Sequence, residues 1–190
     1  GSSIPEEFGG FGGDLGFDAI TLYELGRTAG DSGSWGYAIQ SIVVHYINAY
    51  GTDEQKNRIL PKVAEGECIL TTALVPGSSV TVTDDRLSGS VDFVPYGLEA
   101  DLILIPTDEG VYIVESAGEG VSLTPRETTT GHYQAVVTLE NVLSERLGSG
   151  STEEIVTWIR LRTDSGICSL LAGACQASLN LAADYTKVRQ

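Results

Sequence analysis

The chain has 190 residues, of which 42% are apolar and 19% carry a charge, a balance typical of folded globular proteins and not of disordered ones. Its formal net charge of −15 disfavours nucleic acid and anionic lipid as partners, because both carry negative charge themselves. No apolar run reaches the roughly 18 residues of a membrane span, and the first residues lack a basic signal region. We therefore expect a cytoplasmic protein with no membrane span.

The cysteines and histidines give little basis for a metal site or for nucleophilic catalysis. Cys68, Cys168 and Cys175 form no C-x-x-C pair, and only His45 and His132 could join them as ligands. Two histidines and the lack of a G-x-S-x-G sequence also disfavour a histidine-based triad. We predict buried free thiols and no metal.

The sequence contains no methionine, which is unusual for a chain of this length. Its first three residues, Gly-Ser-Ser, look like the remnant of a tag. We expect either a fragment of a longer protein or a chain from which some residues were omitted.

The first part of the chain predicts helices joined by short loops. Glycines interrupt residues 4–13, and glycine in a helix interior costs roughly 1 kcal/mol relative to alanine, so a loop is expected there. Apolar residues recur at helical spacing from Phe17, and the stretch from Gly26 to Gly30 should end this helix. A second helix is predicted over residues 34–50 and should end at Gly51.

Residues 52–55, Thr-Asp-Glu-Gln, match a capping box and predict the start of a third helix. In this motif the Thr hydroxyl and the Gln side chain each satisfy a backbone N–H at the helix start. The helix should end near Gly66, so residues 1–66 are interpreted as the end of a helical domain.

Residues 67–148 predict a middle β domain, because the apolar period changes from 3.6 to 2. Residues 102–105 are continuously apolar and should be buried on both faces, while residues 108–110, Asp-Glu-Gly, suit a tight hairpin turn. Several short strands at close spacing favour an antiparallel β-sandwich or barrel. The predicted strands are 69–74, 80–83, 86–93, 102–106, 110–114, 121–123 and 133–139.

Residues 149–190 predict one long helix, opened by a second capping box at residues 151–154. Its small residues, including Gly173 and Ala177, leave a surface on which another helix can pack closely. The overall fold class is therefore α+β: a helical N-terminal segment, an antiparallel β domain, and a helix that begins an all-α bundle.

Three stretches of the chain resemble the acyl-CoA dehydrogenase family. Residues 4–10, Ile-Pro-Glu-Glu-Phe-Gly-Gly, are similar to its P-E-x-[YF]-G-G sequence, and residues 50–67 resemble its G-T-x-E-Q-K…LP…GE stretch. Residues 185–190 resemble the start of its Y-x-x-x-R-x-x-F-G motif. The order of helices, β domain and long helix is also that of the family.

This resemblance implies an FAD-dependent enzyme that removes a proton and a hydride from an acyl-CoA thioester and yields trans-2-enoyl-CoA. The resemblance also implies a role in fatty-acid metabolism and an electron-transfer flavoprotein or a similar protein as electron acceptor. It further implies assembly into a homo- or hetero-oligomer, a dimer or a tetramer. In such an enzyme the cofactor carries the redox chemistry, and the protein positions the reacting atoms and excludes water.

The flavin loop of the family usually reads T-E-P-x-x-G-S-D, and residues 73–79 of this chain take its place. The resemblance implies cofactor contacts from Leu74, Val75, Gly77 and Ser78, although the T-E pair and the final Asp are missing. Backbone N–H groups and Ser hydroxyls in such a loop suit a flavin edge or a phosphate.

A second flavin stretch of the family, [WF]-[IV]-[TS], is matched by residues 93–95, Phe-Val-Pro. Phe93 would cover the flavin, although an ordinary core aromatic is an equal reading, and Pro95 offers neither a hydroxyl nor an N–H. Arg189 matches the family arginine that reaches the FAD pyrophosphate across a subunit interface, a role suited to a guanidinium group.

No catalytic glutamate is found in this chain. Most family members carry it beyond the position of Arg189, and a minority carry it at a place that corresponds to Thr163, which cannot act as a base at neutral pH. Asp164 is adjacent, but a neighbouring helix position points about 100° away. Two alternatives remain open: a non-catalytic, flavin-poor subunit that supports a competent partner, and a small-ligand β-barrel flanked by unrelated helices.

Overall fold

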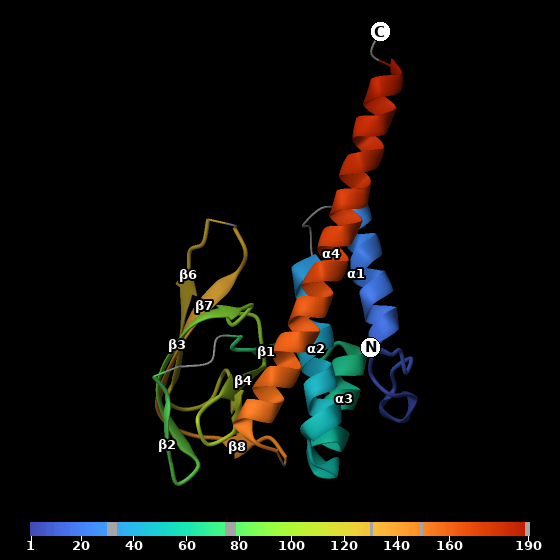
Figure 1. Ribbon diagram of the computed structural model, residues 1–190. Coiled ribbons are helices and arrows are strands. Elements are labelled where there is room, and N and C mark those ends of the chain that lie inside the picture. Colours follow the sequence, from blue (N-terminus) through green and yellow to red (C-terminus); the bar gives the residue numbers. More distant parts are fainter. Residues whose placement is uncertain (30–33, 75–78, 130, 149, 189–190) are drawn as a thin grey trace.

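The computed structural model describes the chain as two adjoining parts, one helical and one built from β-sheets (Figure 1). Residues 1–29, 34–74, 79–129, 131–148 and 150–188 are described. The helices are η1 (Glu6–Phe8), α1 (Leu15–Ala29), α2 (Ser34–Tyr50), α3 (Asp53–Glu65) and α4 (Thr152–Val188). The α+β class predicted from the sequence is confirmed.

The predicted bounds of α2 agree with the structure, but α1 continues through Gly26 instead of stopping there. A Cβ atom at Gly26 would overlap the carbonyl oxygen of Leu170 in α4. The glycine therefore allows two helices to approach closely and does not end the helix. Gly173 of α4 does the same from the other side, because a Cβ there would overlap the carbonyl oxygen of Tyr23.

The capping box at the start of α3 is present as predicted. The Gln55 N–H donates to the Thr52 hydroxyl (3.2 Å), and the Thr52 N–H donates to Oε1 of Gln55 (3.0 Å). The buried Gln55 amide nitrogen also donates to Oε1 of Glu145 (2.7 Å) and to the carbonyl of Arg146 (2.9 Å). One side chain thus caps a helix and joins it to the β domain.

Two four-stranded sheets form the β part. The first has the order β1-β4-β5-β8 and the second the order β2-β3-β7-β6. All pairs are antiparallel as predicted except β1 with β4, which run parallel. The strands are β1 (Leu70–Thr72), β2 (Thr81–Thr83), β3 (Arg86–Pro95), β4 (Leu102–Pro106), β5 (Val111–Glu115), β6 (Val121–Arg126), β7 (Gln134–Leu143) and β8 (Glu145–Arg146).

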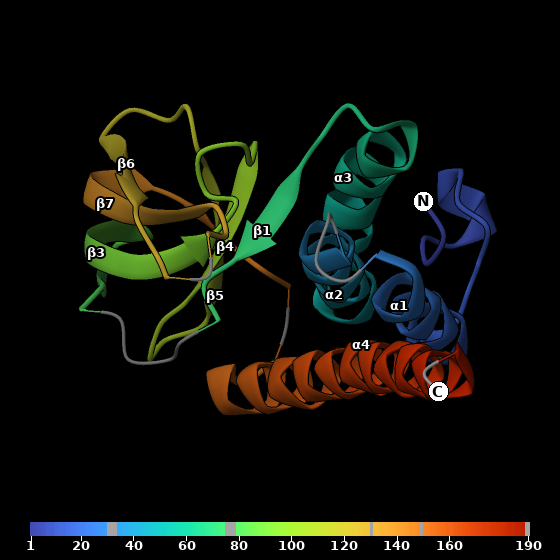
Figure 2. The same ribbon diagram turned by 90° about the horizontal axis from the view of Figure 1, so that it is seen from above.

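Strand β4 contributes to two hydrophobic cores. Leu104 packs into the core shared by the helices and the first sheet, whereas Ile103 and Ile105 pack into the core between the two sheets. These three side chains are fully buried, so the prediction of a strand buried on both faces is confirmed. Seen from above, the first sheet lies between the second sheet and the helices (Figure 2).

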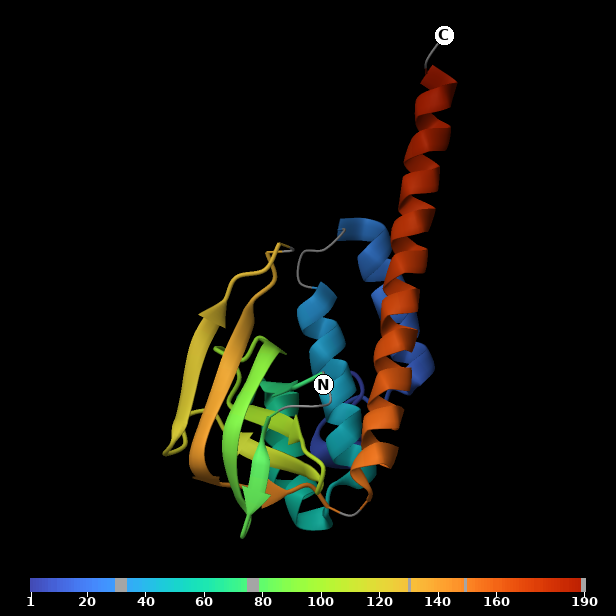
Figure 3. The ribbon, with the colours of Figure 1, turned by 60° about the vertical axis from the view of Figure 1, so that its left-hand side comes forward.

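Helix α4 packs along α1 and then extends beyond the rest of the molecule (Figure 3). Among the described residues, α4 is the one helix that is long and apolar enough to cross a membrane, whereas the sequence predicted no membrane span. A single such helix is weak evidence for a membrane span, because helices of soluble bundles can pass the same test. Its exposed large apolar residues are Leu161, Leu171, Leu179, Leu181, Tyr185 and Val188.

The prediction of three buried thiols is wrong for two of them. Cys168 and Cys175 lie on α4 and are exposed, whereas Cys68 is buried. Burial raises the pKa of the Cys68 thiol to about 11, so this thiol stays protonated at neutral pH.

Candidate functional site

The first and third strands of the β part meet at their carboxyl ends. The hydroxyl of Thr71 in β1 donates a hydrogen bond to the carbonyl of Pro95 in β3, and both residues are buried. Ala73, two residues after Thr71, and Val94, one residue before Pro95, pack into the same core between the sheets. The start of the first predicted flavin segment, at Ala73, and the second segment therefore lie near each other.

A pocket of about 150 Å³ lies where the segment after β1 and the end of β4 face α4. Its single hydroxyl on α4, Oγ1 of Thr163, is buried and has no hydrogen-bond partner. A buried hydroxyl without a partner is costly, and a bound ligand could satisfy it. The residues that line the pocket are Ala73, Leu74, Pro106, Val156, Ile159, Arg160, Thr163 and Asp164.

Both helix positions considered for the catalytic base reach this pocket. Thr163 and Asp164 both line it, although we expected the Asp164 side chain to point away. Asp164 is exposed, so it lies at the open edge of the pocket. The residues that line this pocket thus include an exposed aspartate, an exposed arginine (Arg160) and a buried hydroxyl without a partner.

Phe93 is not a core aromatic, which corrects one of the two readings of its sequence. The residue is 46% exposed, and the guanidinium of Arg126 lies 5.1 Å from the centre of its ring. Phe93 does not belong to the residues that line the pocket beside Leu74. The side chains of Phe93 and Leu74 therefore lie in different places, although the Thr71 side chain links the strand before Leu74 to Pro95.

Four of the predicted cofactor residues lie outside the described part of the chain: Val75, Gly77, Ser78 and Arg189. Their assignment stays a prediction. Leu74 lines the pocket, and Pro95 is buried with its carbonyl bonded to Thr71.

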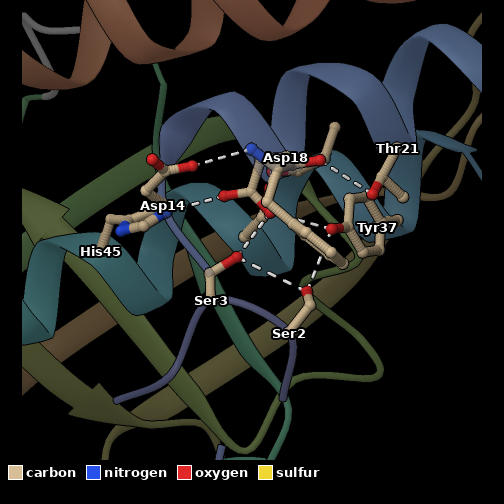
Figure 4. A network of polar contacts seen from close by, with 10 residues as sticks. Ser2, Ser3, Asp14, Asp18, Thr21, Tyr37 and His45 are labelled. Atoms are coloured by element: carbon tan, nitrogen blue, oxygen red, sulfur yellow. Dashed lines mark hydrogen bonds and ion pairs between the residues drawn. The ribbon is translucent and has the colours of Figure 1, made fainter. Parts of the chain in front are cut away.

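A second polar cluster, which the sequence analysis did not single out, surrounds the carboxylate of Asp18 (Figure 4). Oδ1 of Asp18 accepts hydrogen bonds from the hydroxyls of Ser3 (2.5 Å) and Tyr37 (2.8 Å), and Oδ2 lies 2.7 Å from Nε2 of His45. Burial alone would raise the pKa of Asp18, but the hydrogen bonds from His45, Ser3 and Tyr37 together outweigh burial and lower it. The carboxylate is therefore held in its charged form.

This cluster contains Ser, His and Asp, but its geometry is not that of a nucleophilic triad. In a triad the histidine lies between the carboxylate and the serine, so that it can take the serine proton. Here Asp18 is central, and Ser3 donates directly to Asp18. The cluster instead ties the N-terminal segment to α1 and α2, and no local sequence pattern could have revealed it because its members come from three segments.

Comparison with known proteins connects the chain to one family. The model of the acyl-CoA dehydrogenase N-terminal domain matches residues 1–67. An acyl-CoA dehydrogenase of Bacillus subtilis is 26% identical over 217 aligned residues, which cover 100% of this chain and 57% of that protein. The mouse mitochondrial long-chain specific acyl-CoA dehydrogenase is 32% identical over 118 residues, which cover 55% of this chain and 27% of that protein.

Solved structures agree over the full length of the chain. The structure of a steroid ACAD variant is 27% identical, with a TM-score of 0.84. The aligned region covers 100% of this chain and 55% of the chain in that structure. Butyryl-CoA dehydrogenase from Megasphaera elsdenii has the same fold, with 21% identity, a TM-score of 0.85, and coverage of 100% and 58%. The chain spans little more than half of these proteins at most. Residues 1–67 therefore match the N-terminal domain of the acyl-CoA dehydrogenase family, and the chain as a whole is similar to acyl-CoA dehydrogenases in sequence and shares their fold.

Proposed function

We propose that the full-length protein is an FAD-dependent acyl-CoA dehydrogenase that converts an acyl-CoA thioester to trans-2-enoyl-CoA. The observation that supports this most directly is the hydrogen bond from the Thr71 hydroxyl to the Pro95 carbonyl, because it joins the strand that leads into residues 73–79 to the end of the second predicted flavin segment. The pocket between Leu74 and Thr163 lies beside this junction. Since the chain spans only part of its relatives, the activity is proposed for the whole protein.

The residues present fit FAD in part. The unpaired hydroxyl of Thr163 and the exposed ring of Phe93 could each contact a planar polar group, whereas Pro95 lacks the hydroxyl that the family usually has. When bound, FAD would accept the hydride from the substrate. The apolar side chains of Leu74 and Ile159 would exclude water from the pocket.

The proton-accepting base is not assigned to a residue of this chain. Thr163 is not a base at neutral pH, and Asp164 is the only carboxylate among the described lining residues. The same proposal includes an electron-transfer flavoprotein as the electron acceptor, assembly into a dimer or tetramer, and a cytoplasmic location.

A specific observation favours a second candidate, a non-catalytic subunit that binds little flavin and supports a competent partner in a hetero-oligomer. Pro95 is buried, has no N–H, and its carbonyl is already bonded to Thr71. This removes a polar contact that other members offer. A two-protein complex of Mycobacterium tuberculosis shares the fold, with 23% identity and a TM-score of 0.83.

Absorption spectroscopy of the purified full-length protein separates the two candidates. The dehydrogenase should show the absorption bands of oxidised flavin, and these should bleach when acyl-CoA thioesters of graded chain length are added without oxygen. A protein that stays colourless after incubation with FAD would contradict the dehydrogenase proposal for this subunit. Flavin that is bound but bleached by none of the thioesters would favour the supporting subunit.

A further inference from the structure

Strand β3 carries an irregularity at the residue predicted to cover the flavin. Its register against β7 shifts between Val91 and Val94, so β3 contains one extra residue there. Val91 and Val94 are both buried in the core between the sheets, whereas Asp92 and Phe93 between them are both exposed. The bulge thus places two consecutive side chains outside this core. Bulges often redirect side chains in this way near functional sites.

One arginine from another strand contacts both of these side chains. Nη2 of Arg126, at the end of β6, lies 3.1 Å from Oδ2 of Asp92, and its guanidinium carbon lies 5.1 Å from the centre of the Phe93 ring. Strand β7 separates β6 from β3 in the sheet. Arg126 therefore reaches across one strand to hold the bulge.

The backbone of Phe93 is in a conformation that needs such support. Its φ angle is 57°, in the left-handed region that bulky residues rarely adopt. The Phe93 N–H donates to Oδ1 of Asp92 (3.0 Å), so Asp92 fixes the backbone while its other oxygen pairs with Arg126. Strained residues of this kind persist where several contacts determine them, and they cluster at ligand sites.

We propose that Arg126 is a positioning residue that holds the ring of Phe93 as a stacking platform for the isoalloxazine ring of FAD. This inference rests on the proposed function and adds a residue to it. The guanidinium covers the ring from one side, and the ring keeps enough open surface for a second planar group, since 46% of the residue is exposed. A ring held in place before binding loses little freedom when the ligand stacks on it.

The test measures FAD binding and the flavin absorption spectrum of the full-length protein and its variants. Arg126→Gln should weaken FAD binding about two- to fivefold, in line with a partly exposed cation–π contact, and should shift the flavin spectrum in the same direction as Phe93→Leu. Arg126→Lys should restore most of the affinity, because it keeps the cation. The double variant should bind no more weakly than Phe93→Leu alone, because Arg126 acts through the ring.

Arg86→Gln is the matched control for loss of positive charge. Arg86 lies at the start of β3 and bonds to the carbonyl of Asn141, away from the bulge, so its loss should leave the affinity and the spectrum unchanged. If the wild type binds FAD and Arg126→Gln behaves like it, or if the effects of the two single variants simply add, the inference is overturned while the proposed function stands. A wild type that binds no FAD overturns both.

Discussion

Nε2 of His45 in α2 lies 2.7 Å from Oδ2 of Asp18 in α1, and both side chains are largely enclosed. This contact joins two helices through a buried carboxylate that also accepts hydrogen bonds from Ser3 and Tyr37. Each of these donors would lose its charged acceptor if the carboxylate were removed. The stability of the helical part should therefore depend strongly on this one side chain.

Asp18→Ala should destabilise the protein by roughly 3–5 kcal/mol, the usual effect of removing one partner of a buried charged network. The free energy of unfolding in urea, followed by circular dichroism, measures it. Asp14→Ala is the control: Asp14 accepts from the Phe17 N–H at the exposed start of α1, so its loss should cost only about 1 kcal/mol. Equal losses for the two variants would contradict a special role for the cluster.

The contribution of Asp18 should also depend on pH. Its pKa is lowered in the folded protein from the ordinary value of 3.8, so its stabilisation is complete above that value and is lost as the pH falls through the folded pKa. The difference in unfolding free energy between the wild type and Asp18→Asn should be constant near neutral pH and shrink below 3.8. Urea unfolding at a series of acidic pH values measures this, and a constant difference down to the most acid pH would disprove it.

Gly173→Ala should force α1 and α4 apart, because the added Cβ would overlap the backbone of Tyr23. We expect a loss of roughly 1–3 kcal/mol or more, as for other overpacked interfaces. Gly166→Ala on the same helix is the matched control, since its Cβ would meet only the flexible end of Leu22, at 3.2 Å. Alanine favours a helix over glycine by about 1 kcal/mol, so this control should be neutral or slightly stabilising. Thermal unfolding of both variants decides between these outcomes.

Gln55→Ala should cost more stability than Thr52→Ala. Thr52→Ala removes only the cap of α3, worth about 1 kcal/mol. Gln55→Ala removes the reciprocal cap bond and also the bonds to Glu145, Arg146 and Gly148, which join α3 to the β part. Measured unfolding free energies that are the same for the two variants would show that this connection adds no stability.

Thr163→Val should separate stability from ligand binding. Oγ1 of Thr163 is buried without a partner, so replacing it with a methyl group of similar size should leave the ligand-free protein as stable or make it slightly more stable. If this hydroxyl contacts FAD or substrate in the full-length protein, the same change should weaken binding severalfold, by about one hydrogen bond. Thermal unfolding and FAD titration of this variant and of Thr163→Ser check both parts.

Local patterns in the sequence determined most of the elements. The bounds of α2, the capping box of α3 and the buried strand β4 follow from residues that lie next to one another in the chain. Such signals depend on backbone hydrogen bonds and on the periodicity of burial, which a short window contains. The family resemblance also came from the sequence, because its motifs are continuous.

Contacts between distant residues decided the rest. The sequence predicts that Gly26 ends a helix, but Gly26 lies against the backbone of Leu170 in α4. Tertiary packing therefore outweighs the tendency of glycine to end a helix. The parallel pairing of β1 with β4, the bulge at Phe93 and the cluster around Asp18 likewise join residues far apart in the chain.

For the candidate site, the sequence by itself determined which residues correspond to the flavin segments of the family. Only the tertiary structure decided that the Thr71 hydroxyl bonds to the Pro95 carbonyl, that Phe93 is exposed beneath Arg126, and that Leu74 shares a pocket with Thr163. The physical reason is that side-chain direction depends on strand register and helix packing, and both arise from long-range contacts that no short stretch of sequence encodes.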